Sequence, residues 1–169
     1  SSPRMLLGGF FTAGGGVAAR NIASWNGTAW SPLASGTADS QGFPDVYAST
    51  MWDPDGAGPL GEQLVIAGDF TVAGGVSCRR IARWDGTTWQ PFGTGMTDSV
   101  FCVTTWDADG DGPQAAQVIA GGFFGIAGGQ SASRIARWDG AAWRNMGAGF
   151  TAEGEAAKTS YPVGVGAQD

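Results

Sequence analysis

The sequence predicts an all-β protein built from a repeated unit of four short antiparallel strands. A ten-residue motif occurs three times, as 21–30, 80–89 and 134–143. Neighbouring copies lie roughly 50–60 residues apart, a period typical of repeat architectures. The 169-residue chain contains 30 Gly, eight Trp and nine Phe. This composition favours short strands joined by tight turns, because disordered segments normally lack aromatic residues.

The last repeat displays the expected unit most clearly. Its strand-like segments are short and separated by Gly, Asp or Pro, and they comprise Val100–Trp106, Gln117–Phe124, Ser133–Trp138 and Trp143–Gly147. Between the third and fourth segments stands Asp139-Gly140, which suits the positive φ values of a tight hairpin. Four antiparallel strands per period form the blade of a β-propeller. The sequence therefore predicts a β-propeller of four-stranded antiparallel blades, with three blades' worth of strands per chain.

The chain is expected to form a single propeller segment over 1–169, with repeats at about 5–52, 63–106 and 117–169. The segment after residue 149 departs from the pattern, and we expect it to supply one more inner strand near Val163 and Val165. Closed propellers have roughly four to eight blades. Two interpretations remain open: two copies join head to tail into a six-bladed homodimer, or further blades belong to a longer chain.

Aromatic, glycine and cysteine residues are expected to serve packing. The paired Trp residues of the motif are large enough to fill the space between neighbouring blades. Glycine pairs such as Gly121-Gly122 lie within an expected strand, where a close approach of other backbone explains them. Cys78 and Cys102 occupy non-equivalent repeat positions. We expect two buried free thiols, with a disulfide as the alternative.

Composition excludes several classes of function. The formal net charge is −6 and the chain has no His. A nucleic-acid partner is disfavoured, because neutralising phosphates requires a cluster of basic residues. The lack of His removes Ser-His-Asp and Cys-His catalysis within this chain. No apolar run approaches the length of a membrane-spanning helix.

One loop resembles part of a calcium site. Asp107, Asp109 and Asp111 alternate and are followed by Gly112, as in the first half of an oxygen-rich calcium loop. Val118 stands where an EF-hand places its bidentate Glu. A hairpin turn is the simpler interpretation, because turns select Asp and Gly without any metal. No other cofactor is expected, and calcium is the one candidate ion.

Other polar residues have structural and functional interpretations side by side. Six Arg residues at the expected third strands could capture an anionic glycan or form ion pairs with neighbouring turns: Arg20, Arg79, Arg80, Arg83, Arg134 and Arg137. Asn26 begins a glycosylation acceptor motif, which we interpret as a turn. In an up-and-down blade, the second-to-third strand loops and the interblade connections share one face. Both variations in repeat length fall on this face, so a ligand is expected there.

The repeats resemble those of a known group. A pattern Gly-Gly-x-Phe, Ala-Gly-Gly and Ile-Ala-Arg-Trp-Asp-Gly-x-x-Trp, carried here by 120–143, is similar to kelch-type blades. It is closer to the repeats of large secreted planctomycete and related bacterial proteins, and fungal cortical polarity markers have a related pattern. The resemblance implies an extracellular or cell-surface location and supplies no catalytic residue. We expect a non-catalytic module that binds a glycan or protein or acts as a scaffold, with a domain of a larger propeller enzyme as the alternative.

Overall fold

The computed structural model describes residues 4–40, 44–110 and 114–151. Across these ranges the secondary structure consists of β-strands, so the predicted all-β class is confirmed. Among these residues no helix is long and apolar enough to cross a membrane. The expected inner strand around Val163 and Val165 lies outside the described residues.

Three antiparallel sheets form the body of the molecule. Sheet 1 has the order β1 (Met5–Gly8), β4 (Ile22–Trp25) and β5 (Trp30–Pro32). Sheet 2 has the order β7 (Val46–Trp52), β8 (Gln63–Gly68), β11 (Ile81–Trp84) and β12 (Trp89–Pro91). Sheet 3 has the order β13 (Val100–Trp106), β14 (Gln117–Gly122), β17 (Ile135–Trp138) and β18 (Trp143–Asn145). The described residues form no closed sheet.

Each repeat also contains a small hairpin between its second and third main strands. The pairs are β2 (Ala13–Gly14) with β3 (Val17–Ala18), β9 (Val72–Ala73) with β10 (Val76–Ser77), and β15 (Ile126–Ala127) with β16 (Gln130–Ser131). The hairpins turn on Gly15, Gly74 and Gly128, with φ values of 57°, 57° and 58°. These hairpins are not predicted from the sequence, because strands of two residues show no periodicity.

The small hairpins connect one repeat to the next. β6 (Thr37–Ala38) follows sheet 1 in the chain but pairs with β9 of the next repeat. The same position after sheet 2, Met96, forms a bridge to Ala127 of the third repeat. Residues that follow one sheet therefore complete the hairpin of the next.

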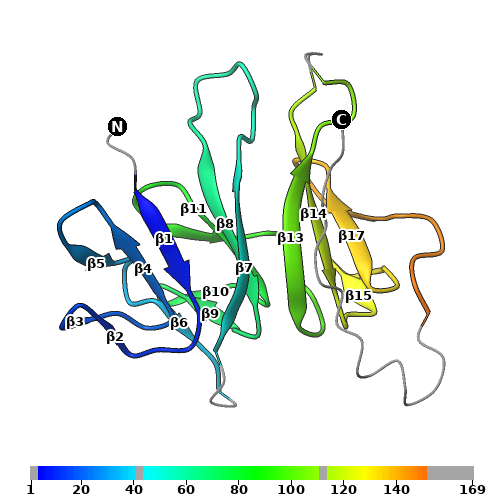
Figure 1. Cartoon of the computed structure of the whole chain (residues 1–169). Coiled ribbons are helices and arrows are strands. Elements are labelled where there is room, and N and C mark those ends of the chain that lie inside the picture. The colour runs from blue at the N-terminus through cyan, green and yellow to red at the C-terminus, as the bar shows by residue number, and fades with distance from the viewer. Residues whose placement is uncertain (1–3, 41–43, 111–113, 152–169) are drawn as a thin grey trace.

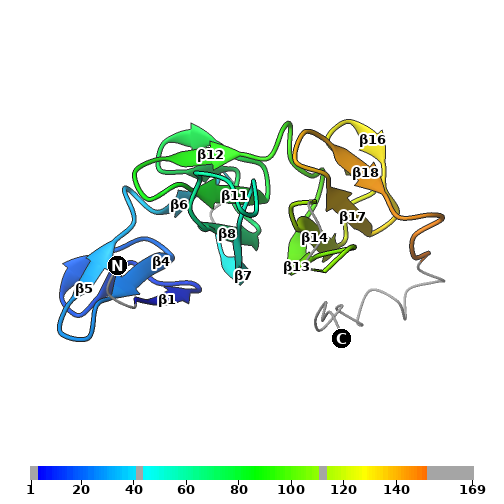
Figure 2. The same ribbon diagram turned by 90° about the horizontal axis from the view of Figure 1, so that it is seen from above.

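The three sheets stand side by side along an arc. Seen from above, β7 and β13 lie toward one side of this arc and β12 and β18 toward the opposite side (Figure 2). In the side view, the β7–β8 loop reaches one end of the molecule, while hairpins β2–β3 and β9–β10 lie toward the other (Figure 1). The two kinds of connection therefore occupy opposite faces, as the sequence analysis expected.

Alternating residues of β8 divide the core between its two neighbours. Leu64 and Ile66 pack in the cluster shared with sheet 1, whereas Val65 and Ala67 pack in the cluster shared with sheet 3. This is the period-two alternation of a strand that is buried on both faces. At the centre of the second cluster lies Phe92, which is fully buried.

Most Trp residues are packing elements, as predicted. Four are buried, namely Trp52, Trp89, Trp138 and Trp143. Three are half-buried, namely Trp25, Trp30 and Trp84. Trp106 differs from its counterpart Trp52, because it is 42% exposed and Trp52 only 2%. Burial thus depends on whether a neighbouring sheet covers the ring.

Close backbone approach explains glycine in the second main strands. A Cβ on Gly68 would meet the carbonyl oxygen of Asp45, and one on Gly122 would meet that of Ser99. Both positions lie beside a register shift in the adjoining inner strand, between Val46 and Ala48 or between Val100 and Cys102. These bulges turn the chain tightly enough that a side chain would clash.

Cys78 and Cys102 are free and buried, which confirms the expected thiols. Burial raises the pKa of the Cys78 thiol to about 11 and also raises that of Cys102. Both thiols therefore stay protonated at neutral pH and behave as small apolar packing groups.

Candidate functional site

The repeats disagree most on the face that carries the small hairpins. At the position of Asp69, which follows β8, the other two repeats have Phe10 and Phe123. The residue that precedes the third main strand is Asn21, Arg80 or Arg134, and each of these has a positive φ of 63–69°. The backbone is therefore the same in each repeat, while the chemistry of the side chains changes.

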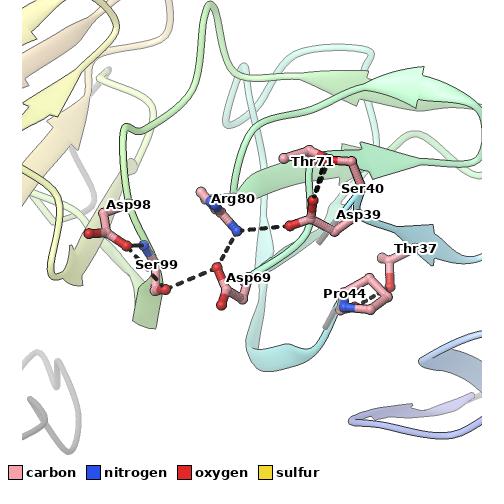
Figure 3. A network of polar contacts seen from close by, with 9 residues as sticks. All are labelled: Thr37, Asp39, Ser40, Pro44, Asp69, Thr71, Arg80, Asp98 and Ser99. Atoms are coloured by element: carbon pink, nitrogen blue, oxygen red, sulfur yellow. Dashed lines mark hydrogen bonds and ion pairs between the residues drawn. The ribbon is translucent and has the colours of Figure 1, made fainter. Parts of the chain in front are cut away.

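In sheet 2 these positions hold a charged network (Figure 3). Arg80 Nη1 donates to Asp39 Oδ2 at 3.4 Å and also pairs with Asp69 Oδ1. Ser99 Oγ donates to Asp69 Oδ1 at 3.0 Å, and Thr71 Oγ1 donates to Asp39 Oδ1 at 3.4 Å. The network joins three segments: the connection after β6, the turn after β8 and the start of β13. Removing Arg80 would leave the Asp39 side chain, only 4% exposed, without this cation.

Sheet 1 has a neutral version of this arrangement. Asn21 Nδ2 donates to Thr37 Oγ1 at 3.1 Å, and its Oδ1 accepts the backbone N–H of Phe11 at 3.0 Å. Thr37 Oγ1 in turn donates to the carbonyl of Pro44 at 2.6 Å. Asn therefore supports the positive-φ position here without an ion pair, which agrees with its tolerance of the left-handed region.

Sheet 3 replaces the carboxylate with an aromatic ring. The guanidinium of Arg134 lies 5.4 Å from the ring centroid of Phe123. Phe123 makes an edge contact with Phe101 at 4.9 Å, and Phe101 lies 5.5 Å from Tyr47. Tyr47 is 45% exposed. We refer to Tyr47, Phe101 and Phe123 as the aromatic row. It runs from β7 to the end of β14, with Ser99 connecting it to the charged network.

The charged network carries an excess of carboxylate. Asp45 accepts the backbone N–H of Asp69 through its own carbonyl, at 2.9 Å. Its carboxylate Oδ1 is buried and has no hydrogen-bond partner. Desolvation raises the pKa of Asp45, and the negative charge of Asp69 raises it further. Asp39 and Asp69 thus share one Arg, and Asp45 lies close enough to Asp69 for their charges to interact.

The network also places a hydroxyl group beside a carboxylate. Ser99 Oγ donates to Asp69 Oδ1, which also accepts from Arg80. The aromatic row, in which Tyr47 is 45% exposed, lies next to these carboxylates and this guanidinium.

The loop proposed to bind calcium lies only partly within the described residues. Asp107 and Asp109 are exposed, and Asp111 lies outside the described part of the chain. Asp107 Oδ1 accepts the N–H of Asp109 at 3.2 Å, and Asp109 Oδ2 accepts that of Gln114 at 3.3 Å. These bonds are typical of a turn stabilised by Asp. No group of three potential metal ligands occurs within the described ranges, and calcium at this loop stays a prediction.

The turns between the third and fourth main strands are stabilised by the first residue of each Asx-Gly pair. Asn26 Oδ1 accepts the N–H groups of Thr28 and Ala29 at 2.9 and 2.8 Å, which supports the turn interpretation of this motif. The backbone N–H of Thr88 is the largest of the interactions that hold the pKa of Asp85 well below its usual range. Arg144, together with backbone N–H groups, lowers the pKa of Asp139 to about 2.

The six Arg residues meet different partners. Arg80 forms the expected ion pairs, whereas Arg83 Nη2 donates to Gln90 at 3.0 Å and Arg137 Nη1 donates to Gln117 at 3.0 Å. Burial lowers the pKa of Arg83, whose guanidinium lies 5.7 Å from the ring of Trp52. Arg20 and Arg79 are exposed. The described Arg residues do not converge on one anion-binding cluster.

Comparison of the chain with protein families, with curated proteins and with solved structures finds no match.

Proposed function

We propose that the three sheets are blades of a β-propeller and that the protein is a non-catalytic, extracellular scaffold and binding module. The described residues contribute three sheets, and a closed ring has roughly four to eight. Closure then requires further blades, which self-association supplies. The extracellular setting follows from the resemblance of the repeats to those of secreted proteins.

A junction that is repeated between neighbouring sheets carries this proposal. Trp89 Nε1 of sheet 2 donates to the carbonyl of Leu33, which follows sheet 1, at 3.3 Å. Trp143 Nε1 of sheet 3 makes the corresponding bond to Phe92, which follows sheet 2, at 3.0 Å. A junction that recurs with the same donor and the same acceptor position propagates a stack of blades in one rotational sense.

Backbone hydrogen bonds repeat in the same way. The N–H of Gly74 donates to the carbonyl of Gly36, and the N–H of Gly128 donates to that of Gly95, each at 2.8 Å. These bonds do not depend on the identity of the side chains. They support an interpretation in which successive blades have one fixed relative orientation.

The ligand that the aromatic row fits best is a glycan. Sugar rings have apolar faces that pack on aromatic rings, and their hydroxyl groups bond to carboxylates and guanidinium groups. Tyr47, Phe123 and Arg134 provide this combination next to the Asp69 and Arg80 pair. Asp69 stands where the other two repeats have Phe10 and Phe123, so the carboxylate beside the aromatic row distinguishes this surface from its counterparts and suits it to recognition.

A glycan array with purified protein tests the binding function. We expect binding to at least one glycan class and a loss of about tenfold or more when Tyr47→Ala and Phe123→Ala are combined, since each stacked ring contributes on the order of 1 kcal/mol. Phe10→Ala is the matched control, because Phe10 holds the position of Phe123 in sheet 1 and is 69% exposed outside the row. Binding that is absent from the array, or unaffected by the double variant, would contradict the proposal.

A further inference from the structure

One face of sheet 1 is exposed to solvent, although the equivalent faces of sheets 2 and 3 are buried. Met5 and Leu7 of β1 correspond to Leu64 and Ile66 of β8, because Met5 and Leu64 both pair with the first Trp of the motif. Met5 and Leu7 are 55% and 47% exposed, whereas Leu64 and Ile66 are 4% and 0% exposed. In sheets 2 and 3 this face receives the preceding sheet.

The small hairpin of sheet 1 has the same conformation as the hairpins that receive a neighbour. The N–H of Ala19 donates to Thr12 O at 3.0 Å across β2–β3, as that of Cys78 donates to Thr71 O at 2.9 Å across β9–β10. Gly14 occupies the position of Ala73 and Ala127, which pair with the preceding repeat in the other two cases. The receiving hairpin of sheet 1 is therefore formed in advance.

The turn after β18 has the same geometry as the turns after β5 and β12, which lead to the residues that pair with the next repeat. The N–H of Gly149 donates to Met146 O at 3.3 Å, as that of Gly95 donates to Phe92 O at 3.1 Å. The N–H of Phe150 donates to Ser133 O at 2.8 Å, which is the bond that Met96 makes to Arg79. Met96 is docked on the next repeat and 2% exposed, whereas Phe150 is 64% exposed.

We propose that Phe150 of one copy docks on hairpin β2–β3 of a second copy, opposite Gly14 and against the ring of Trp30. The side chains at this pair position are complementary in size. Thr37 and Met96 face an alanine, whereas the larger Phe150 would face a residue without a side chain. The Trp30 ring lies 3.9 Å from the Cβ position of Gly14, and Phe150 would cover it.

The same junction supplies two further contacts between the copies. By analogy with Trp143 and Phe92, Trp30 Nε1 donates to the Met146 carbonyl. By analogy with Gly128 and Gly95, the Gly15 N–H donates to the Gly149 carbonyl. Two such junctions related by a two-fold axis unite six sheets in one ring. This inference rests on the proposed propeller and names the surface through which it closes.

Disulfide trapping tests the contact directly. Cys78→Ala and Cys102→Ala first remove the native thiols, and Ala is the natural residue at the corresponding positions Ala19 and Ala48. Gly14→Cys and Phe150→Cys are then introduced together and oxidised at several protein concentrations. Two residues that face each other at a non-hydrogen-bonded position of an antiparallel pair have Cβ atoms close enough for a disulfide. We expect a covalent species of twice the 17.2 kDa chain mass under non-reducing conditions.

Two matched variants calibrate this result. Met96→Cys with Ala127→Cys places the same pair within one chain, and it should form a disulfide without a change in mass. Val17→Cys with Phe150→Cys moves one thiol to the other strand of the hairpin and should cross-link at least tenfold more slowly. Retention of the single-chain mass by the Gly14 and Phe150 pair, or equal rates for both pairs, would overturn the inference.

Native mass spectrometry of the unmodified chain separates this inference from the proposed function. We expect a dimer, and Phe150→Ala should weaken its association by tenfold or more, as truncating a central aromatic anchor does. If the chain forms a dimer but the Gly14→Cys and Phe150→Cys pair does not cross-link, or if Phe150→Ala does not weaken the dimer, this surface is rejected. The proposal of a propeller scaffold is not affected by that outcome. A single chain at all concentrations would reject association with a second copy, while glycan binding would be judged by its own array.

Discussion

The outward face of sheet 1 and the corresponding face of sheet 2 have the same backbone and opposite burial. Leu7 on β1 is 47% exposed, and Ile66 at the same position on β8 is fully buried. Both lie in second main strands that pair in the same register with an Ile-Ala segment. The difference arises from the neighbour, since sheet 2 is covered by sheet 1 and the described residues place no sheet on the other side of sheet 1.

This contrast distinguishes structure that is fixed by local hydrogen bonds from structure that depends on packing between sheets. Hairpins and turns depend on short-range bonds, so they are alike whether or not a neighbour is present. Burial of the Trp and aliphatic side chains depends on stacking, as the exposure of Trp106 against that of Trp52 illustrates. Stability in stacked repeats is accordingly a sum of local terms and interface terms, and paired substitutions can measure each.

The largest expected difference is between Ile66→Ala and Leu7→Ala. Ile66→Ala removes a fully buried side chain from the junction of sheets 1 and 2, and we expect a loss of about 2–5 kcal/mol in the free energy of unfolding. Leu7→Ala should change it by less than about 0.5 kcal/mol in dilute solution, as is usual for exposed positions. Urea unfolding followed by Trp fluorescence measures both.

Protein concentration sharpens this comparison. If a second copy covers sheet 1, the cost of Leu7→Ala should rise with concentration, because unfolding is then linked to dissociation. The effect of Ile66→Ala should not depend on concentration to the same degree. Equal losses for the two variants in dilute solution would mean that the face of sheet 1 is covered in some other way.

Glycine in the small hairpins gives the next comparison. A Cβ on Gly74 would meet the Cδ1 atom of Trp89, which is 3% exposed, whereas a Cβ on Gly15 would lie 2.6 Å from Cδ1 of the half-buried Trp30. Both positions have positive φ, which costs a side chain about 1–2 kcal/mol. We expect about 2–4 kcal/mol for Gly74→Ala and less for Gly15→Ala, because Trp30 has room to move.

Gly75→Ala is the control for backbone strain in this pair. Gly75 has a φ of 86°, and a Cβ there would have no neighbour within 4 Å. Its substitution should therefore cost about 1 kcal/mol, from strain alone. Thermal unfolding of the three variants side by side would contradict the packing argument if Gly74→Ala were no worse than Gly75→Ala.

Much of the secondary structure could be predicted from the sequence. The bounds of β13 agree with the expected segment Val100–Trp106, because the strand is long and ends in Trp-Asp. The other three strands are shorter than expected: β14 ends at Gly122, β17 begins at Ile135 and β18 ends at Asn145. In the second strand, the chain turns at the glycine where Ser99 approaches, and this contact involves residues distant in sequence.

The charged network was harder to predict. Its acidic residues Asp39 and Asp69 are far from each other in the sequence, and stacking of the repeats brings them to Arg80. A signal was present nevertheless, because Asp69 stands where the other repeats have Phe10 and Phe123. A position where repeats change chemical class indicates a local role. The identity of the partner still requires the fold.

A third comparison sets Arg80 against Arg134, two residues with the same backbone conformation and different partners. Arg80→Met removes the guanidinium that pairs with Asp39, whose side chain is 4% exposed, and we expect a loss of about 2 kcal/mol in stability. Arg134→Met removes a contact with Phe123 that is worth about 0.5–1 kcal/mol. Chemical unfolding in low and high salt measures both, and a larger loss for Arg134→Met would contradict the assignment of a structural ion pair.

The smallest expected effect concerns acid stability at the turn of Asp139. The folded pKa of this residue is about 2, below its ordinary value of 3.8, so it contributes stability that is present above pH 3.8 and lost as the pH falls toward 2. Its partner Arg144 is more than half exposed, so solvent screening limits the contribution to a few tenths of a kcal/mol. Asp139→Asn, which copies Asn26 of sheet 1, should retain the turn and lose this pH dependence. Acid unfolding of the variant and the parent chain between pH 2 and 5 measures the difference, and curves that remain parallel would show that the charge of Asp139 adds no stability through Arg144 or the backbone N–H groups.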